Sequence, residues 1–129
     1  MSDPIVVVGS GIAGALFAIH AAERADVLAL SRPGAVGSTP WAQGGIAAAI
    51  DPADSPESHV DDTVASGAGL VDRSAASSMC ADAPRSIQEL VDLGVAFDRE
   101  ADGRLSLGRE GAHSTRRVVH ADGDSTGAR

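Results

Sequence analysis

The most constraining feature of the sequence is a glycine pattern that follows a short apolar run near the amino terminus. The run is Ile5-Val6-Val7-Val8, and the next residues, Gly9-Ser10-Gly11-Ile12-Ala13-Gly14, fit the pattern G-x-G-x-x-G. A β-branched run that stops at glycine predicts a strand, which we expect to be buried on both faces of a parallel sheet. Gly9 permits a tight turn, Gly11 lets the backbone approach a pyrophosphate, and Gly14 lets a helix pack on the strand. Residues 9–14 therefore predict a dinucleotide site, with a purely structural glycine turn as the alternative.

The residues after this turn complete one βαβ unit. Apolar and small residues at helical spacing extend from Gly11 to Arg24, and a second strand is predicted over Val27 to Leu30. The fold class is α/β and Rossmann-like, but one βαβ unit cannot form an open doubly wound sheet. We therefore expect the 129 residues to be the amino-terminal part of an incomplete domain.

The end of the second strand departs from the pattern of an NAD site. Such a site has Asp or Glu at this position to hold the ribose, whereas the sequence here reads Leu30-Ser31-Arg32. Ser31 can still hydrogen-bond a ribose hydroxyl, and Arg32 can approach the adenosine end or a phosphate. A solvated arginine at the end of the strand is the equally weighted alternative for Arg32.

Charge and cysteine content exclude several classes of partner. The formal net charge of −8, with ten scattered basic residues, disfavours nucleic acid and membrane surfaces as partners. Cys80 is the single cysteine, so no internal disulfide can form, and we expect a reducing, cytoplasmic location. We expect Cys80 itself to be a small buried residue of a helix.

Further elements are predicted along the rest of the chain. Asp54 or Ser55 before Pro56 starts a helix that ends at Gly67, and Asp72 starts another that continues to Leu93, with a break or kink near Pro84. Gly94 suits a left-handed cap. A hairpin is predicted around residues 98–103, between the apolar residues of 95–97 and 105–107, and a further strand is predicted from Val118.

Residues 31–45 are rich in glycine, proline and hydroxyl residues, which predicts an ordered loop over a ligand. The segment Gly37-Ser38-Thr39-Pro40-Trp41-Ala42-Gln43-Gly44-Gly45-Ile46-Ala47-Ala48 resembles the flavin-binding loop of the superfamily of succinate dehydrogenases, fumarate reductases and L-aspartate oxidases. The resemblance implies FAD, with contacts from Ser38, Thr39, Pro40, Trp41, Ala42, Gln43, Gly44 and Gly45. Respiratory members carry a histidine where Ser38 stands, and it links the flavin covalently. Serine here therefore implies non-covalent FAD.

A second segment carries a narrower resemblance. Residues 109–121, Arg-Glu-Gly-Ala-His-Ser-Thr-Arg-Arg-Val-Val-His-Ala, resemble the active-site strand and loop of the L-aspartate oxidases. The resemblance implies that Glu110 pairs with the α-ammonium group of the substrate. Taken alone, Glu110 would be a solvated charge. His113 either lines the pocket or holds the loop. We expect no metal, because His59, His113 and His120 lack metal-ligand spacing.

The resemblance implies an FAD-dependent oxidation of L-aspartate to iminoaspartate, the first step of NAD biosynthesis through quinolinate. Oxygen or fumarate would reoxidise the flavin, and functional coupling to quinolinate synthase is possible. The capping domain and the carboxy-terminal helical domain of the family are absent, so we expect this fragment alone to be inactive. The alternatives are a soluble flavoprotein of the fumarate reductase or succinate dehydrogenase type, and a non-catalytic truncated fragment.

Overall fold

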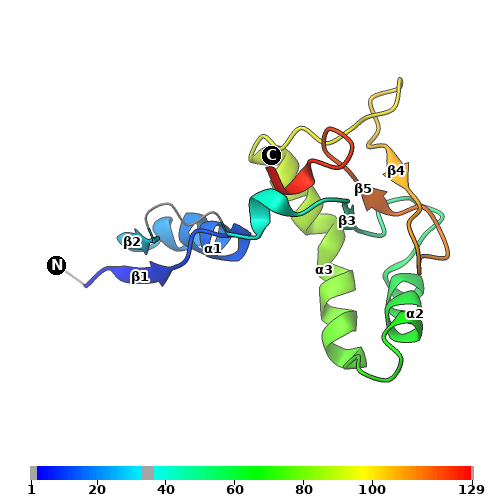
Figure 1. The fold of residues 1–129 in the computed structure, drawn as a ribbon, viewed down its shortest axis with the longest axis horizontal. Coiled ribbons are helices and arrows are strands. Elements are labelled where there is room, and N and C mark those ends of the chain that lie inside the picture. The colour runs from blue at the N-terminus through cyan, green and yellow to red at the C-terminus, as the bar shows by residue number, and fades with distance from the viewer. Residues whose placement is uncertain (1–2, 33–36, 129) are drawn as a thin grey trace. The chain divides into compact units, whose positions relative to one another are not determined.

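The computed structural model describes residues 3–32 and 37–128, which contain both helices and strands. It divides into two compact units, an amino-terminal unit of residues 1–42 and a carboxy-terminal unit of residues 43–127 (Figure 1). Part of the predicted flavin loop, residues 33–36, lies outside the described residues. Among the residues that are described, no helix combines the length and the apolar character needed to cross a membrane.

The amino-terminal unit is the predicted βαβ unit. Strand β1 (Ile5–Val8) pairs in parallel with β2 (Val27–Leu30), and helix α1 (Ile12–Ala22) connects them. The register sets Ile5 opposite Val27 and Val8 opposite Leu30. Both strand predictions are confirmed. For β1 the continuous β-branched run and the glycine that follows it are local signals in the sequence.

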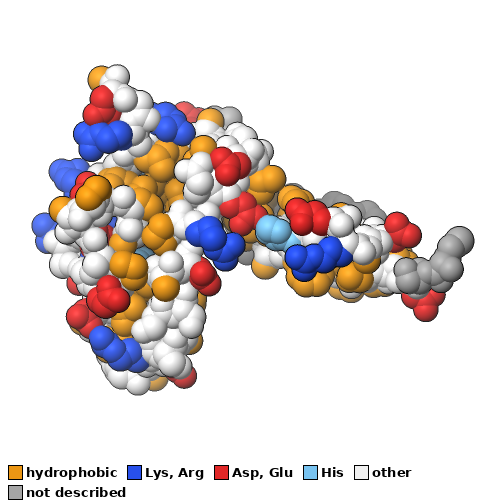
Figure 2. Space-filling view, turned by 180° about the vertical axis from the view of Figure 1, so that it is seen from behind, with side chains coloured by type: hydrophobic (Ala, Val, Ile, Leu, Met, Phe, Trp, Pro, Cys, Tyr) orange, Lys and Arg blue, Asp and Glu red, His pale blue; other side chains and the backbone are white. Residues whose placement is uncertain are grey.

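The expectation that β1 is buried on both faces is wrong. Val7 is buried, but Val6 is 52% exposed and Val8 is 83% exposed. A strand is buried on both faces only where other elements cover both faces of its sheet. In this unit α1 is the element that packs on β1 and β2, and apolar side chains, orange in Figure 2, remain at the surface.

Two helices of the carboxy-terminal unit begin where the sequence predicts. Helix α2 (Pro56–Ser66) follows Ser55, whose hydroxyl accepts a hydrogen bond from the Ser58 amide, and it ends at Gly67. Helix α3 (Arg73–Asp92) follows Asp72, whose carboxylate accepts the amides of Ser74 and Ala75. Side-chain capping of this kind satisfies amides that have no partner within the helix.

A break near Pro84, one of the two predicted alternatives, does not occur, because α3 is one continuous helix from Arg73 to Asp92. The other alternative, a kink at Pro84, stays a prediction. Proline removes one backbone hydrogen bond, but Cys80 and Ile87 on either side of it are buried. Packing of this apolar face holds the helix together across the proline. Gly94, just beyond the helix, has the predicted left-handed conformation, with φ of 99°.

The core of this unit has two apolar clusters. Val60 of α2 packs with Ala76 and Cys80 of α3, which confirms Cys80 as a buried helix residue. The second cluster joins α3 to a small sheet and consists of Ala48, Ile87, Phe97, Val119 and Ala121.

The sheet of the carboxy-terminal unit has the order β3-β5-β4 and is antiparallel throughout. The strands are β3 (Ile46–Ala47), β4 (Leu107–Gly108) and β5 (Val118–Val119), so the strand predicted from Val118 is confirmed. The predicted hairpin is shorter than expected: an antiparallel bridge joins Arg99 to Leu105, whereas Leu107 pairs with Val119 of β5. Short 3-10 helices, η1 (Thr39–Trp41) and η2 (Thr126–Ala128), complete the elements.

Candidate functional site

The glycine turn between β1 and α1 has the geometry that its pattern predicts. Gly9 has φ of 108°, a conformation that favours glycine, and its amide donates to the Leu30 carbonyl at 2.9 Å. A Cβ atom added at Gly14 would overlap the Gly9 carbonyl oxygen. Glycine at position 14 therefore lets α1 lie directly against the turn.

The amino terminus of α1 opens into a cavity. Gly11 is the N-cap residue of α1, with φ of −70° and ψ of 173°, and as a glycine it makes no side-chain capping hydrogen bond. The Ile12 amide donates weakly, at 3.3 Å, to the Thr39 hydroxyl. The first turn of α1 holds no acidic side chain, so the partial positive charge of the helix end is available to an anion.

This cavity at the start of α1 has a volume of about 590 Å³ and brings together seven predicted cofactor residues. Its lining among the described residues includes Gly9, Ser10, Gly11, Ser31, Arg32, Thr39 and Pro40, together with Val8, Leu30 and Gly37. The Ser10 hydroxyl donates to the Ser31 hydroxyl at 3.0 Å, which links the turn to the end of β2. Ser38, Trp41 and Ala42 are not in this lining, and Trp41 is 73% exposed.

The remaining predicted flavin contacts, Gln43, Gly44 and Gly45, belong to the carboxy-terminal unit. Gly44 has φ of 72°, and a Cβ atom added there would lie 3.8 Å from Oε1 of Glu110. A Cβ atom added at Gly45 would overlap the Val119 carbonyl oxygen of β5. Gly45 is thus required by strand packing, a role that sequence reasoning did not assign to it.

Glu110 lies in the loop of residues 109–117, which joins β4 to β5, and is paired with a histidine. Its Oε1 is 2.7 Å from Nε2 of His120, the residue directly after β5. The Glu110 side chain is 48% exposed, and that of His120 is 20% exposed. The carboxylate is therefore accessible to a ligand while one of its oxygens is held.

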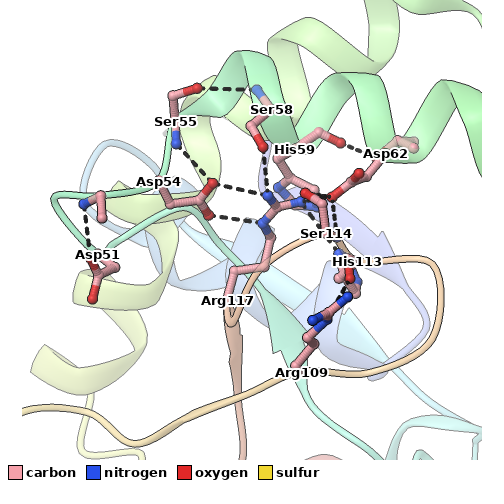
Figure 3. Close-up of polar contacts among 12 residues, drawn as sticks. Asp51, Asp54, Ser55, Ser58, His59, Asp62, Arg109, His113, Ser114 and Arg117 are labelled. Carbon is pink, nitrogen blue, oxygen red and sulfur yellow. Dashed lines mark hydrogen bonds and ion pairs between the residues drawn. The ribbon is translucent and has the colours of Figure 1, made fainter.

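The base of the same loop is anchored by a buried cation, Arg117, shown in Figure 3. Its Nε and Nη2 atoms donate to the two oxygens of Asp54 at 2.8 and 2.9 Å, and its Nη1 donates to Asp62 at 2.6 Å. Nη2 also donates to the Ser58 hydroxyl at 3.0 Å. A fully buried guanidinium needs such partners, because an unpaired buried charge is strongly destabilising.

The carboxylates of this Arg117 cluster stay ionised. The Ser114 amide is the largest cause that lowers the pKa of Asp62 to about 2, and the Ser114 hydroxyl and Arg117 lower it further against the opposing effect of burial. Burial opposes ionisation of Asp54 as well, but hydrogen bonds from Arg117 and the Ser55 amide still lower its pKa. Burial disfavours the charged form of Arg117, yet its two aspartate partners raise its pKa.

The two histidines nearest to the cluster face it. Burial, followed by the charge of Arg117, lowers the pKa of His59, and its Nδ1 is buried without a hydrogen-bond partner. His113 Nδ1 lies 3.5 Å from Nη1 of Arg117, and the two histidine rings are 5.5 Å apart. The Arg109 Nε donates to the His113 carbonyl at 3.1 Å. These contacts favour the loop-holding interpretation of His113.

The loop also contains backbone strain. Ala112 has φ of 68°, in the left-handed region that residues with a Cβ atom rarely adopt. It lies between Glu110 and His113, and the His113 amide donates to the Glu110 carbonyl at 3.3 Å. The turn that carries Glu110 is therefore closed on itself.

Sequence reasoning missed the roles of Asp54, Asp62, Arg117 and His120. The sequence pattern indicates a helix start at Asp54 and argues against His120 as a metal ligand, but it does not indicate the side-chain contacts that these residues make. Within residues 3–32 and 37–128, no group of three or more His, Cys, Asp and Glu side chains is arranged to hold a metal ion.

Comparisons with known proteins find similarity to L-aspartate oxidases over nearly the whole chain. The chain is 49% identical over 124 residues to an L-aspartate oxidase of Mesorhizobium japonicum, covering 95% of this chain and 24% of the relative. It is 46% identical over 127 residues to an L-aspartate oxidase of Streptomyces coelicolor, covering 96% of this chain and 22% of the relative. The chain thus spans about a quarter of the length of these curated relatives.

Solved structures show the same fold. The Mycobacterium smegmatis Sdh1 complex in the apo form matches with a TM-score of 0.88 and 33% identity, over 97% of this chain and 22% of that one. The FrdA chain of an E. coli quinol fumarate reductase matches with a TM-score of 0.84 and 30% identity, over the same shares. The sequence profile of the family described as "FAD binding domain" matches residues 4–129. Because this match covers nearly the whole chain, the chain belongs to the FAD-binding domain family.

Proposed function

We propose that this chain is the amino-terminal part of the Rossmann-like FAD-binding domain of an L-aspartate oxidase. The similarity to curated L-aspartate oxidases over 95% and 96% of the chain supports this assignment. The proposal includes a capping domain and a carboxy-terminal helical domain supplied by the rest of the protein. The complete site, and hence turnover, belongs to that longer protein.

The residues of the amino-terminal unit fit the phosphate end of FAD. The cavity at the start of α1 is about 590 Å³, and the helix end offers amides and a favourable dipole to a pyrophosphate. Gly11 suits this role, because a Cβ atom there would already lie 3.3 Å from the Thr39 hydroxyl. Ser31 and Arg32, which also line the cavity, would hold the ribose and the adenosine end. Ser38 offers no imidazole for a covalent link, so the cofactor would be dissociable.

The residues of the carboxy-terminal unit would recognise the substrate. When bound, the flavin would accept the hydride from Cα of L-aspartate while the substrate nitrogen releases its protons to solvent, which gives iminoaspartate, and oxygen or fumarate would take up the two electrons. Glu110 would bind the α-ammonium group, the feature that distinguishes aspartate from succinate. The observation that carries this proposal is the half-exposed Glu110 carboxylate beside Gly44, at the end of the flavin-loop segment.

A flavoprotein of the fumarate reductase or succinate dehydrogenase type is the second candidate. The TM-scores of 0.88 and 0.84 show that the chain has the same fold as such proteins. Two residues disfavour fumarate reduction or succinate oxidation as the function. Ser38 stands where respiratory members carry the flavin-linking histidine. Glu110 gives the site a carboxylate, and succinate has no ammonium group to pair with it.

The deciding experiment is Glu110→Gln in the full-length enzyme, with kcat/KM measured for aspartate oxidation and for fumarate reduction. The lost charge-assisted hydrogen bond is worth roughly 1.5 to 3 kcal/mol, so the aspartate-to-fumarate ratio of kcat/KM should fall by one to two powers of ten. Glu57→Gln, at an exposed position in the first turn of α2, is the control. Equal losses for the two substrates would make Glu110 a structural residue, and no loss for aspartate would leave the choice of aspartate as the substrate unsupported.

The proposal extends to location and coupling. A single cysteine agrees with a cytoplasmic enzyme, and its product would pass to quinolinate synthase. Cell fractionation tests the location, and co-purification with quinolinate synthase tests the coupling.

A further inference from the structure

We propose that His120 is a positioning residue that holds the Glu110 carboxylate ready for the α-ammonium group of the substrate. This inference rests on the proposed function and deepens it, because it names a second determinant of substrate choice at the same site.

The hydrogen bond between the two side chains leaves one carboxylate oxygen available. Nε2 of His120 donates to Oε1 of Glu110 at 2.7 Å. Among the described residues, Oε2 of Glu110 makes no hydrogen bond, and the side chain is 48% exposed. The carboxylate is therefore fixed through one oxygen and can offer the other to a ligand.

The imidazole ring that fixes it is itself held between two glycines. A Cβ atom added at Gly108, at the end of β4, would lie 2.7 Å from Cε1 of His120. A Cβ atom added at Gly45, just before β3, would lie 3.0 Å from Cδ2 of the same ring. The distance of 2.7 Å is too short for a real Cβ contact, and the distance of 3.0 Å is tighter than most such contacts, so the absence of side chains at these two positions makes room for the ring.

The backbone of His120 is fixed as well. The residue directly follows β5, the central strand of the sheet, and its carbonyl accepts the Asp98 amide at 2.8 Å. Glu110, by contrast, sits in an exposed loop, where a free glutamate side chain populates several rotamers. A rigid donor on the sheet thus orders a flexible acceptor on the loop, which is pre-organisation of a binding group.

The test uses full-length enzyme and compares His120→Phe with His120→Gln. Phenylalanine keeps a ring between the glycines but has no donor, whereas glutamine keeps a donor near the position of Nε2. We expect His120→Phe to lower the aspartate-to-fumarate ratio of kcat/KM about tenfold, mainly through a higher KM for aspartate, and His120→Gln to restore most of it. Bound FAD per protein, measured from flavin absorbance, reports folding of each variant. If His120→Phe does not retain FAD, His120→Leu replaces it.

The same comparison is made in the Glu110→Gln background. If His120 acts through Glu110, adding His120→Phe there lowers the ratio no further. A wild-type ratio in His120→Phe, or equal losses in the Phe and Gln variants, would overturn the positioning role while leaving the proposed function intact. An unchanged ratio in Glu110→Gln alone would overturn the recognition role of Glu110, and the role of His120 with it. The proposed function itself would be overturned if the wild-type full-length enzyme did not oxidise aspartate.

Discussion

Replacing Asp62 with asparagine should cost the folded chain stability in a manner that depends on pH. The pKa of Asp62 falls on folding from its ordinary 3.8 to about 2, first because of the Ser114 amide and then because of the Ser114 hydroxyl and Arg117. Its side chain is 18% exposed, so solvent screens these interactions little. The change in pKa corresponds to about 2 kcal/mol of unfolding free energy, present in full above about pH 5.

The sign follows from proton uptake. A carboxylate with a lowered pKa in the folded state binds fewer protons there than in the unfolded chain, so its stabilisation is lost as pH falls through the folded value. The pH-dependent part of the difference in stability between wild type and Asp62→Asn should therefore shrink from about 2 kcal/mol at about pH 5 to about 1 kcal/mol at about pH 3. Below about pH 2 the wild-type side chain is neutral, as asparagine is.

Urea denaturation followed by circular dichroism at 222 nm measures this difference, because the signal reports α2 and α3 of the unit that contains Asp62. The matched control is Asp61→Asn on the same helix. Asp61 is 67% exposed and pairs at the surface with Arg73, so its replacement should change stability little. A pH-independent loss in Asp62→Asn, or a loss no larger than that in Asp61→Asn, would refute the reasoning.

Three further predictions address the glycines and the cofactor. In the full-length protein, Gly11→Val should abolish FAD retention, because a branched side chain would fill the space of the pyrophosphate; stoichiometric flavin absorbance in the purified variant would contradict this. Gly45→Ala should destabilise the carboxy-terminal unit by about 1 to 3 kcal/mol in urea, because its Cβ atom would overlap the Val119 carbonyl oxygen. The control is Gly111→Ala, where an added Cβ atom meets nothing within 4 Å. Denaturation of the full-length holoenzyme should release all flavin into the ultrafiltrate, whereas flavin left on the chain would show a covalent link.

Local signals predicted the βαβ unit and the helix starts. The apolar run forms β1 itself. Ser55, Pro56 and Asp72 start helices within a few residues of their own positions. The structure at these places therefore follows from nearby sequence. The course of α3 through Pro84 could not be predicted in this way. It depends on packing of the helix against residues distant in the chain, which outweighs the local preference of proline.

The Arg117 cluster could not be predicted from local sequence at all. Arg116 and Arg117 are adjacent and chemically identical, yet Arg116 is exposed and Arg117 is fully buried. Arg117 bonds to Asp54, 63 positions away, and to Asp62, 55 positions away. Only the tertiary fold brings these charges together, and a single sequence contains no measure of that proximity. Glu110 was singled out by family resemblance, whereas its contact with His120 required the strand register.

The left-handed backbone at Ala112 limits which residues natural selection can accept beside the candidate substrate-binding glutamate. A residue with a Cβ atom costs about 1 kcal/mol more than glycine at such a φ, and β-branched residues cost more still. Homologous proteins that keep this loop should therefore vary at this position mainly among glycine, alanine, asparagine and aspartate. Valine, isoleucine and threonine should be rare there. The set of residue types found at position 112 would then reflect a constraint on the backbone rather than any contact made by the side chain.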